Sequence, residues 1–278
     1  MKIFQSLKRV IRADPGTNVR AEDKGRKKYV MKNKLAILGG SALPQLQQFD
    51  ILETRTVGTP FGSTSAPILR GIFSNTEVFF LDRHGADRKT APHKINYRAN
   101  IWALHQLGVD SLISLSNVGG IRSDMTPGHF AFPDQLIDYT HNRPNSFYED
   151  NFDFSRHIDF SQPFSVELHQ QLVEAAQTLN LDFTDDATYG VTQGPRFETI
   201  AEINRMERDG CDIVGMTAMP EAALARELHM RYATIAIVAS KAAGRSDGLH
   251  VDINDIHAVV RQSLGKVHEL LAHVIAGE

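Results

Sequence analysis

Short apolar runs alternate with amphipathic segments along most of this 278-residue chain, and the runs end at glycine or at polar side chains. Residues 35–38 stop at Gly39, while 77–81 and 111–115 are each followed by polar residues. Buried strands separated by helices are typical of an α/β fold, in which ligands bind at the carboxyl ends of the strands. The pattern predicts a single α/β domain with a ligand site along one edge of its sheet.

Helices are expected where apolar residues recur every three or four positions. The last such segment, 256–274, is the longest, and Pro220 suits the first turn of a shorter helix before it. Loops are expected at 122–132 and 140–162. The other segments that we expect to be helical are 97–107, 164–179, 197–208 and 220–228, and further strands are expected at 212–216 and 233–238.

The first 34 residues are strongly basic. They contain 11 Lys and Arg against 3 Asp and Glu, so their charge is +8, and within a total of -3 the rest of the chain carries about -11. Such a segment fits a disordered leader, a tail that binds nucleic acid or an acidic membrane, or translation from a start codon upstream of a natural one at Met31. We expect 1–33 to be a disordered extension and 34–278 to be the folded domain, whose negative charge does not suit a nucleic-acid substrate.

Composition argues against several other classes of protein. No apolar run approaches the roughly 20 residues that span a bilayer, so no membrane association is expected. The single cysteine, Cys211, cannot form an internal disulfide framework and offers no metal-binding spacing. This cysteine usage is typical of a protein in a reducing, cytoplasmic setting.

Hydrogen-bond donors follow the first two predicted strands. The turn at Gly39 and Gly40 can present backbone amides to an anion, with the hydroxyl of Ser41 beside them. Arg83 offers a planar fork of donors for a pair of phosphate oxygens, and His84 is a second donor. Each feature alone is also compatible with an ordinary turn or with a surface pair.

Two further strand ends carry small donors as well. Ser116 and Asn117 follow the third predicted strand, and Thr217 follows the strand expected at 212–216. Because the carboxyl ends of parallel strands meet at one edge of a sheet, these donors should lie near Arg83. The combination predicts an anion site, and phosphate is the simplest anion that fits it.

A planar ring fits the pair Phe197-Glu198. Phe197 could stack on a base, and Glu198 could accept a hydrogen bond from an N–H group of the ring. A 6-oxopurine carries such a donor at N1, whereas adenine would turn a lone pair toward the carboxylate. The soft thioether of Met216 could lie under a sugar. The alternative is that Phe197 and Met216 belong to the core and that Glu198 lies on a solvated helix turn.

Taken together, these residues resemble the trimeric purine nucleoside phosphorylases, on the branch that includes the methylthioadenosine and methylthioinosine phosphorylases. The resemblance runs from about residue 35 to the C-terminus. It implies a single-domain fold with a mixed, twisted central sheet flanked by helices, a homotrimer, and no metal or organic cofactor. The motifs that carry it are Leu38-Gly39-Gly40-Ser41, Thr59-Pro60-Phe61-Gly62, Arg83-His84-Gly85, Asn96-Tyr97-Arg98-Ala99-Asn100-Ile101-Trp102-Ala103-Leu104, Arg143-Pro144-Asn145-Ser146-Phe147-Tyr148, Gln193-Gly194-Pro195-Arg196-Phe197-Glu198 and Met216-Thr217-Ala218-Met219-Pro220-Glu221.

The resemblance also implies roles for single residues. Phe197 and Glu198 match the base-binding pair of the branch that accepts 6-oxopurines, and Met216 matches the methionine that lies against the ribose. His157 matches a histidine that a neighbouring subunit extends toward the 5′ end of the sugar. Ile253 matches the position of a histidine that meets the 5′-hydroxyl in ordinary nucleoside phosphorylases, so an apolar residue there suits a 5′-methylthio group. The positions that match the phosphate site are Ser41, Arg83, His84, Ser116, Thr217 and, through its backbone, Asn117.

One position departs from the family. Where the family has Asn or Asp to hydrogen-bond the purine N7 as the base leaves, this chain has Ser240, which is shorter and donates only one hydrogen bond. The loss of one such donor typically costs about 10²–10³ in rate. A water molecule or Lys241 could replace the donor, the base preference could be unusual, or the activity could be low.

The expected reaction is the reversible phosphorolysis of a purine nucleoside, with 5′-methylthioinosine as the leading substrate, to the free base and a ribose 1-phosphate. In this reading Glu198, Ser240 and His84 are the catalytic residues. The alternatives are an ordinary 6-oxopurine nucleoside phosphorylase for inosine or guanosine, a methylthioadenosine phosphorylase, a hydrolase of similar architecture, and a non-catalytic binder of nucleoside or phosphate. The cationic cluster at Arg83 argues against the hydrolase, and Ser240 keeps the non-catalytic binder open.

Overall fold

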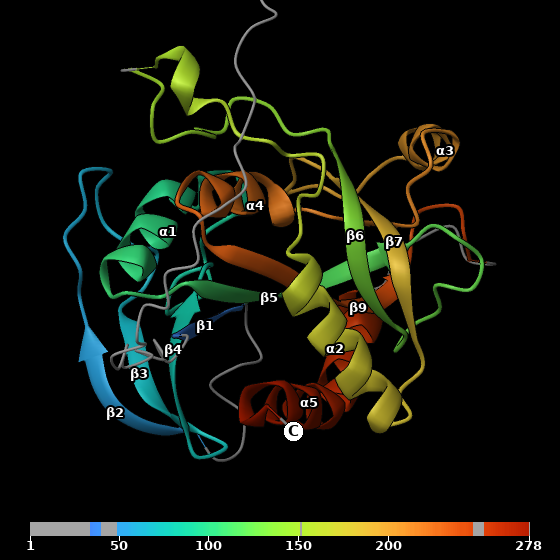
Figure 1. Ribbon diagram of the computed structural model, residues 1–278. Coiled ribbons are helices and arrows are strands. Elements are labelled where there is room, and N and C mark those ends of the chain that lie inside the picture. The colour runs from blue at the N-terminus through green and yellow to red at the C-terminus, as the bar shows by residue number, and fades with distance from the viewer. Residues whose placement is uncertain (1–33, 40–48, 151, 247–252, 278) are drawn as a thin grey trace, which may run out of the picture. The chain divides into compact units, whose positions relative to one another are not determined.

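A mixed sheet forms the centre of the domain, with its strands in the order β2-β3-β4-β1-β5-β8-β7-β6-β9 (Figure 1). β5 also pairs with β9, so the last five strands of this order close into a ring. The computed structural model describes residues 34–39, 49–150, 152–246 and 253–277, and the expected extension at 1–33 lies outside them. The strands are β1 (Leu35–Gly39), β2 (Asp50–Arg55), β3 (Ile68–Phe73), β4 (Thr76–Asp82), β5 (Ser111–Gly120), β6 (Phe130–Asp138), β7 (Phe183–Val191), β8 (Ile213–Gly215) and β9 (Arg231–Lys241).

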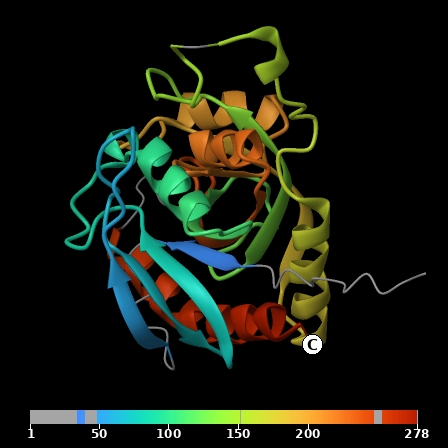
Figure 2. The same cartoon turned by 60° about the vertical axis from the view of Figure 1, so that its left-hand side comes forward.

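The two larger of the three apolar cores that the described residues form cover the two faces of this sheet. Side chains alternate between the faces of a strand, and in β1 the buried Leu38 joins one core while Ile37 joins the other. The first core includes residues of α1 and α4, and the second includes residues of α2 and α5, as the layers in Figure 2 show. The helices are α1 (Tyr97–Gln106), α2 (Val166–Thr178), α3 (Ile200–Arg208), α4 (Ala218–Glu227) and α5 (Ile253–Ala276). The α/β architecture predicted from the sequence is confirmed.

The helix expected at 197–208 begins later than predicted. Thr199 is its N-cap: the Thr199 hydroxyl accepts from the backbone of Glu202, and the Glu202 carboxylate accepts from the backbone of Thr199. This capping box satisfies the free backbone donors at the helix start. As a result Phe197 and Glu198 lie in the loop before α3 and not on the helix itself.

The strand expected at 111–115 is longer than predicted. β5 continues to Gly120 because β9 pairs with it in parallel over its whole length, from Ser111 opposite Arg231 to Gly120 opposite Lys241. Ser116 is therefore inside the strand and not in a loop after it. The sequence analysis also missed β2, β3, β6 and β7, and the loop expected at 122–132 overlaps the start of β6.

Candidate active site

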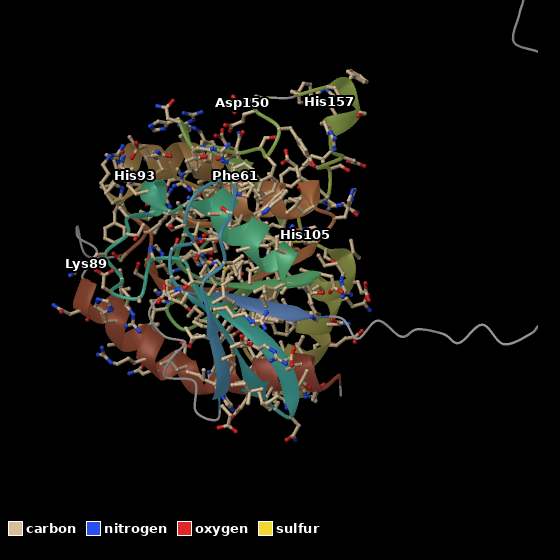
Figure 3. The ribbon with its side chains drawn as sticks, turned by 90° about the vertical axis from the view of Figure 1, so that its left-hand side faces the viewer. Phe61, Lys89, His93, His105, Asp150 and His157 are labelled. Carbon is tan, nitrogen blue, oxygen red and sulfur yellow. The ribbon has the colours of Figure 1, made fainter. Side chains whose placement is uncertain are left out.

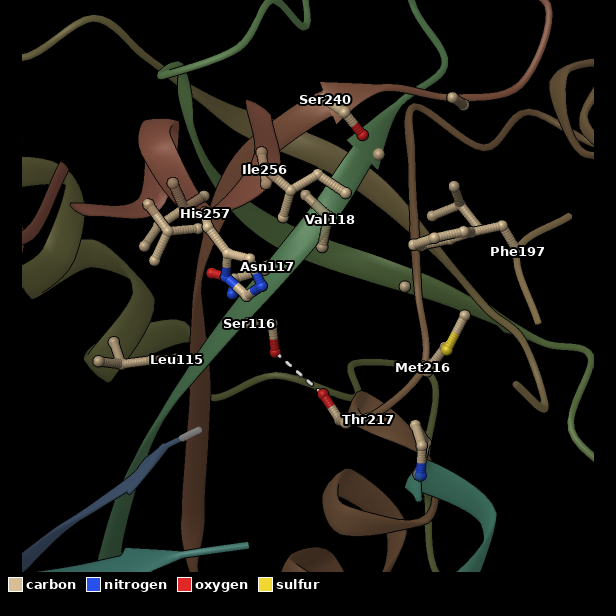
Figure 4. A pocket seen from close by; sticks show the side chains of 18 of the residues that line it. Leu115, Ser116, Asn117, Val118, Phe197, Met216, Thr217, Ser240, Ile256 and His257 are labelled. Atoms are coloured by element: carbon tan, nitrogen blue, oxygen red, sulfur yellow. Dashed lines mark hydrogen bonds between the residues drawn. The ribbon is translucent and has the colours of Figure 1, made fainter. Parts of the chain in front are cut away.

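One cavity of about 600 Å³ brings together most of the predicted site residues (Figure 4). Its walls come from β5 and β9, from the loops after β4, β7 and β8, and from the first turns of α5. Nine of the twelve predicted residues line it: Arg83, His84, Ser116, Asn117, Phe197, Glu198, Met216, Thr217 and Ser240.

The other three predicted residues are not placed in the cavity. Ser41 lies outside the described residues, and of Ile253 only the backbone, at the first position of α5, is described. His157 follows a short 3-10 helix (Phe154–Arg156) near the outer edge of the domain, where Figure 3 labels it. Its ring packs between Phe152 and Phe154, with centroids 5.0 Å away in each case. The chain's own fold therefore does not bring His157 to this cavity.

Arg83 is buried, with only 1% of its surface exposed, and its guanidinium is largely engaged by the protein. Nε and Nη2 donate to the two carboxylate oxygens of Glu221, at 2.7 and 3.1 Å. Nη2 also lies 2.8 Å from the hydroxyl of Ser114, and Nη1 donates to the carbonyl of Leu115 at 2.9 Å. The sequence analysis expected two donors of Arg83 to bind a pair of phosphate oxygens. In the structure Nε and Nη2 bind the carboxylate of Glu221 instead, which corrects that expectation. One N–H of Nη1 remains for a ligand. The positive charge of Arg83, which Glu221 partly neutralises, can also attract an anion.

His84 has a defined tautomer. Its Nδ1 lies 2.9 Å from the carbonyl of Thr90, an acceptor only, so Nδ1 carries the proton and donates. Burial lowers the pKa of His84 below its ordinary value, and the Arg83 cation adds to this effect while the Thr90 carbonyl opposes it. In the neutral ring Nε2 is then an acceptor, which suits a protonated oxygen of phosphate.

Three hydroxyl groups meet beneath the cavity. The hydroxyls of Ser116 and Thr217 are 3.2 Å apart, and both residues are buried. The Tyr189 hydroxyl is buried without a hydrogen-bond partner of good geometry among the described residues, and it lies close to Gly215, where an added Cβ would approach it to 2.3 Å. Burial raises the pKa of Tyr189, and the neighbouring hydroxyls of Ser116 and Thr217 oppose that shift. The cluster offers hydroxyl protons to an anion above it.

The opposite side of the cavity carries the predicted ring site. Phe197 is 46% exposed and faces across the cavity in Figure 4. One carboxylate oxygen of Glu198 accepts from the hydroxyl of Thr192 at 2.5 Å, which leaves the other oxygen for a ligand. Gly194 has φ +60°, and a Cβ there would approach Met216 Sδ to 2.5 Å. Glycine at this position lets the loop pack closely on Met216.

Arg143 holds this side of the cavity together, a role that the sequence analysis did not assign. It is buried, and it has no carboxylate partner among the described residues. Instead it donates to the carbonyls of Thr192, Gln193, Met216 and Met219, at 2.5–3.0 Å. These bonds tie the loop that carries Glu198 to the segment that carries Met216, so Arg143 sets their relative position. The only indication of this role in the sequence was the motif that begins Arg143-Pro144, which belongs to the family resemblance.

Ser240 stands next to an irregularity in the sheet. The register between β5 and β9 shifts by one residue there, from Val118 opposite Val238 to Gly119 opposite Ser240. The neighbouring Lys241 donates to the carbonyls of Ser123 and Arg122, at 2.6 and 3.5 Å. Two of the three N–H donors of Lys241 therefore bind backbone carbonyls. Of these two residues, Ser240 is the one whose side chain offers a hydroxyl to the cavity.

A third wall of the cavity is formed by side chains that the sequence analysis did not assign to the site. The first turns of α5 contribute apolar and polar side chains to it, and the loop after β4 adds Arg88. The periodicity of 256–274 predicted a helix but not what its apolar face contacts, because periodicity alone does not distinguish a core from a cavity wall. The α5 side chains on this wall are Ile256, His257, Val260, Arg261, Leu264 and Val267.

Two other kinds of feature do not occur in the described part of the chain. No group of three or more His, Cys, Asp or Glu side chains is close enough to hold a metal ion among those residues. None of the described helices is both long and apolar enough to cross a bilayer.

Comparison with known proteins identifies the family of the chain. Residues 34–276 match the phosphorylase superfamily. The chain belongs to this superfamily. A probable S-methyl-5′-thioinosine phosphorylase of Pseudomonas syringae pv. tomato is 46% identical over 241 residues, which are 87% of this chain and 98% of the relative. The 6-oxopurine nucleoside phosphorylase of Pyrococcus furiosus is 46% identical over 218 residues, which are 77% of this chain and 81% of the relative.

A solved structure supports the same assignment at the level of the fold. Methylthioadenosine phosphorylase from Schistosoma mansoni, in complex with adenine, superposes with a TM-score of 0.83 at 31% identity. The match covers 88% of this chain and 91% of that one. This phosphorylase is therefore an enzyme of the pentosyltransferase type, with the single α/β fold expected from its sequence.

Proposed function

We propose that this phosphorylase catalyses the reversible phosphorolysis of a 6-oxopurine nucleoside, with 5′-methylthioinosine as the leading substrate. The observation that carries the proposal is that one cavity holds both a donor cluster around Ser116 and Thr217 and the pair Phe197-Glu198. A phosphate and a purine bound at these two places would lie on either side of a sugar. The products would be the free base and (5-methylthio)ribose 1-phosphate.

Phosphate would bind at the buried side of the cavity. The hydroxyls of Ser116 and Thr217 donate to its oxygens, the backbone at Asn117 adds a donor, and Arg83 supplies its remaining N–H together with positive charge. Neutral His84 accepts from the protonated oxygen of hydrogen phosphate through Nε2. Ser41 is proposed as a further phosphate ligand on the family resemblance alone.

The base would lie against Phe197, with its N1–H donating to the free oxygen of Glu198. A lone pair at this position of adenine would face the carboxylate, which favours a 6-oxopurine. Ser240 would donate to the base as negative charge builds on it during departure. A single hydroxyl is a weaker stabiliser than the Asn or Asp of the family, so Glu198 carries more of the discrimination between bases.

Catalysis would consist mainly of positioning and electrostatic stabilisation. As the C1′–N9 bond lengthens, the sugar gains oxocarbenium character and the purine gains negative charge. Phosphate, held on the opposite face, then bonds to C1′ with inversion, and Met216 lies against the ribose. We propose that no metal or organic cofactor takes part.

We also propose a homotrimer in the cytoplasm. The side chain of His157 lies beside Phe152 and Phe154, which are 55% and 85% exposed, on a segment that does not reach the cavity of its own chain. Exposed aromatic side chains on one segment fit a contact with a second copy. In such an assembly His157 would reach the 5′ end of a sugar bound by the neighbouring subunit.

The experiment is the release of free base from methylthioinosine, methylthioadenosine, inosine and adenosine, each with and without phosphate. Methylthioinosine should be cleaved fastest, and none of the four nucleosides should be cleaved when phosphate is absent. Release of adenine would contradict the assignment of Glu198. Cleavage without phosphate would contradict the anion site, and no release from any nucleoside would favour a non-catalytic binding protein.

A further inference from the structure

The Tyr189 hydroxyl is a buried polar group to which the proposed mechanism gives no role. The side chain is 0% exposed, and its hydroxyl has no hydrogen-bond partner of good geometry among the described residues. Tyr189 does not line the cavity, so a ligand there would not touch it. A buried hydroxyl without a partner is unfavourable, because it loses its hydrogen bonds to water and gains none in return. Such a group is therefore a candidate for a functional role.

Three adjacent strands bring this hydroxyl close to the donors proposed for phosphate. β5, β8 and β7 are neighbours in the sheet; Ser116 lies in β5, Thr217 follows β8, and Tyr189 lies in β7. Gly215, at the end of β8, makes room for the Tyr189 hydroxyl, since a Cβ there would lie 2.3 Å from it. Burial raises the pKa of Tyr189, and the hydroxyls of Ser116 and Thr217 oppose that rise as close neighbours.

The hydroxyl pair of Ser116 and Thr217 is short of one proton for binding an anion. The two oxygens are 3.2 Å apart, and the dashed line in Figure 4 marks this hydrogen bond. Each hydroxyl has one proton, so one group donates to the other and the pair keeps only one proton for a ligand. If both hydroxyls donate to phosphate, their oxygens face each other with no proton between them. That arrangement is unfavourable unless a third donor satisfies the oxygens.

We propose that Tyr189 is a positioning residue for phosphate: its hydroxyl donates to the hydroxyl pair and so frees both protons of the pair for the bound anion. This inference rests on the proposed function, because it assumes that phosphate binds above Ser116 and Thr217. A phenol suits the role, since its O–H can rotate toward either oxygen of the pair. Because burial raises the pKa of Tyr189, the phenol keeps its proton at neutral pH and remains a donor.

The first test is the steady-state kinetics of Tyr189→Phe with methylthioinosine and inorganic phosphate. Phenylalanine keeps the ring and removes only the hydroxyl. The KM for phosphate should rise about tenfold, the size expected for one lost hydrogen bond. The KM for methylthioinosine at saturating phosphate should stay the same. An unchanged KM for phosphate would overturn the inference, and so would equal rises for both substrates.

Thermal unfolding with and without inorganic phosphate gives a result that a merely structural role would not produce. In the free protein the Tyr189 hydroxyl makes no hydrogen bond of good geometry that Tyr189→Phe could lose, so the melting temperature without phosphate should not fall. Phosphate raises the melting temperature according to how tightly it binds, so this increase should be smaller in the variant. Equal falls with and without phosphate would mean that the hydroxyl serves only the fold.

Tyr139→Phe is the matched control, because it removes a hydroxyl that has a partner. The Tyr139 hydroxyl donates to Asp209 at 2.7 Å, and Tyr139 does not line the cavity. This variant should melt at a lower temperature with and without phosphate alike, and its KM for phosphate should equal that of the unaltered enzyme. A rise in this KM as large as that in Tyr189→Phe would show a general effect of tyrosine loss and contradict the inference.

A double-mutant cycle with Ser116→Ala tests whether Tyr189 acts through the hydroxyl pair. Without the Ser116 hydroxyl, Thr217 can give its proton to phosphate unaided, so Tyr189→Phe should then raise the KM for phosphate by much less than tenfold. A full tenfold rise in the Ser116→Ala background would mean that Tyr189 acts independently of the pair. If the unaltered protein shows neither phosphate-dependent release of base nor a melting temperature that rises with phosphate, the proposed phosphate site fails, and this inference fails with it.

Discussion

The two sides of the cavity are constructed in opposite ways. On the anion side Arg83, Ser116 and Thr217 are 1%, 4% and 8% exposed. Protein groups accept most of the hydrogen bonds of Arg83, and the hydroxyls of Ser116 and Thr217 lie 3.2 Å apart. On the base side Phe197 is 46% exposed, and Glu198 keeps one carboxylate oxygen free. The anion side is part of the core, while the base side is a loop held in place from behind by Arg143.

Because of this difference, substitutions on the two sides should affect folding stability and substrate specificity separately. A substitution on the anion side leaves buried polar groups without partners, so it should reduce both folding stability and phosphate binding. A substitution on the base side exposes or removes a group that already touches solvent, so it should alter activity with little effect on stability. The predictions below test this separation.

The largest effect is expected for Arg83→Met. It leaves the carboxylate of Glu221, which is 1% exposed, without its bidentate partner. Breaking one partner of a buried ion pair typically costs about 3–5 kcal/mol. Urea unfolding should show a loss of this size, and the KM for phosphate should rise strongly in whatever fraction remains folded.

The double variant Arg83→Met with Glu221→Leu separates the two effects. Replacing a buried ion pair by apolar residues of similar volume is often neutral for stability. The double variant should therefore recover much of the lost free energy of unfolding and keep the high KM for phosphate. An unchanged phosphate dependence in this variant would show that Arg83 serves only the fold.

The residues of the proposed anion side could be picked out from the sequence by their chemistry. A cation and a series of hydroxyl side chains at strand ends indicate anion binding from their chemistry alone, and Arg83, His84, Ser116 and Thr217 all line the cavity. What the sequence could not indicate was the partner of Arg83, because Glu221 lies 138 positions later. Only the packing of α4 against the sheet shows that the fork is already occupied.

An effect on activity alone is expected for Glu198→Ala. Removal of a preorganised hydrogen-bonding group in an active site costs about 10²–10³ in rate, and kcat/KM for the 6-oxopurine nucleosides should fall by that factor. The free energy of unfolding should change by less than about 0.5 kcal/mol, because the side chain is only half-buried.

Glu202→Ala is the contrasting control for this prediction. Glu202 completes the capping box of α3 and pairs with Arg196, but it does not line the cavity. Its loss should cost about 1 kcal/mol of stability, as for other helix caps, and leave the choice of base intact. If Glu198→Ala behaved like Glu202→Ala, Glu198 would be a structural residue and the base assignment would be wrong.

The parts of the fold that the sequence did not predict have physical causes. β2 is an edge strand whose side chains are mostly exposed, so it lacks the alternation that marks a half-buried strand. β6 contains Pro133, which is typical of an edge or an irregularity, and its pairing with β7 shifts register on both sides of that residue. The role of Arg143 depends on four carbonyls distant in sequence, and no spacing pattern indicates such contacts.

The smallest effect is expected in the pH dependence of stability. Burial lowers the pKa of His84 in the folded protein below the ordinary value of about 6.5. Between these two pKa values the unfolded chain binds more protons than the folded one, so stability rises with pH across this window. The folded protein should therefore lose stability as the pH falls below about 6.5, and urea unfolding measured at a series of pH values would show the slope.

His84→Gln identifies the group responsible, since glutamine can still donate to the carbonyl of Thr90 but does not titrate. In this variant the contribution of His84 to the change of unfolding free energy with pH should vanish, while the free energy of unfolding near pH 8 should change little. An unchanged slope would assign the proton uptake to another group. The role proposed for the neutral ring of His84 in phosphate binding would then lose its support.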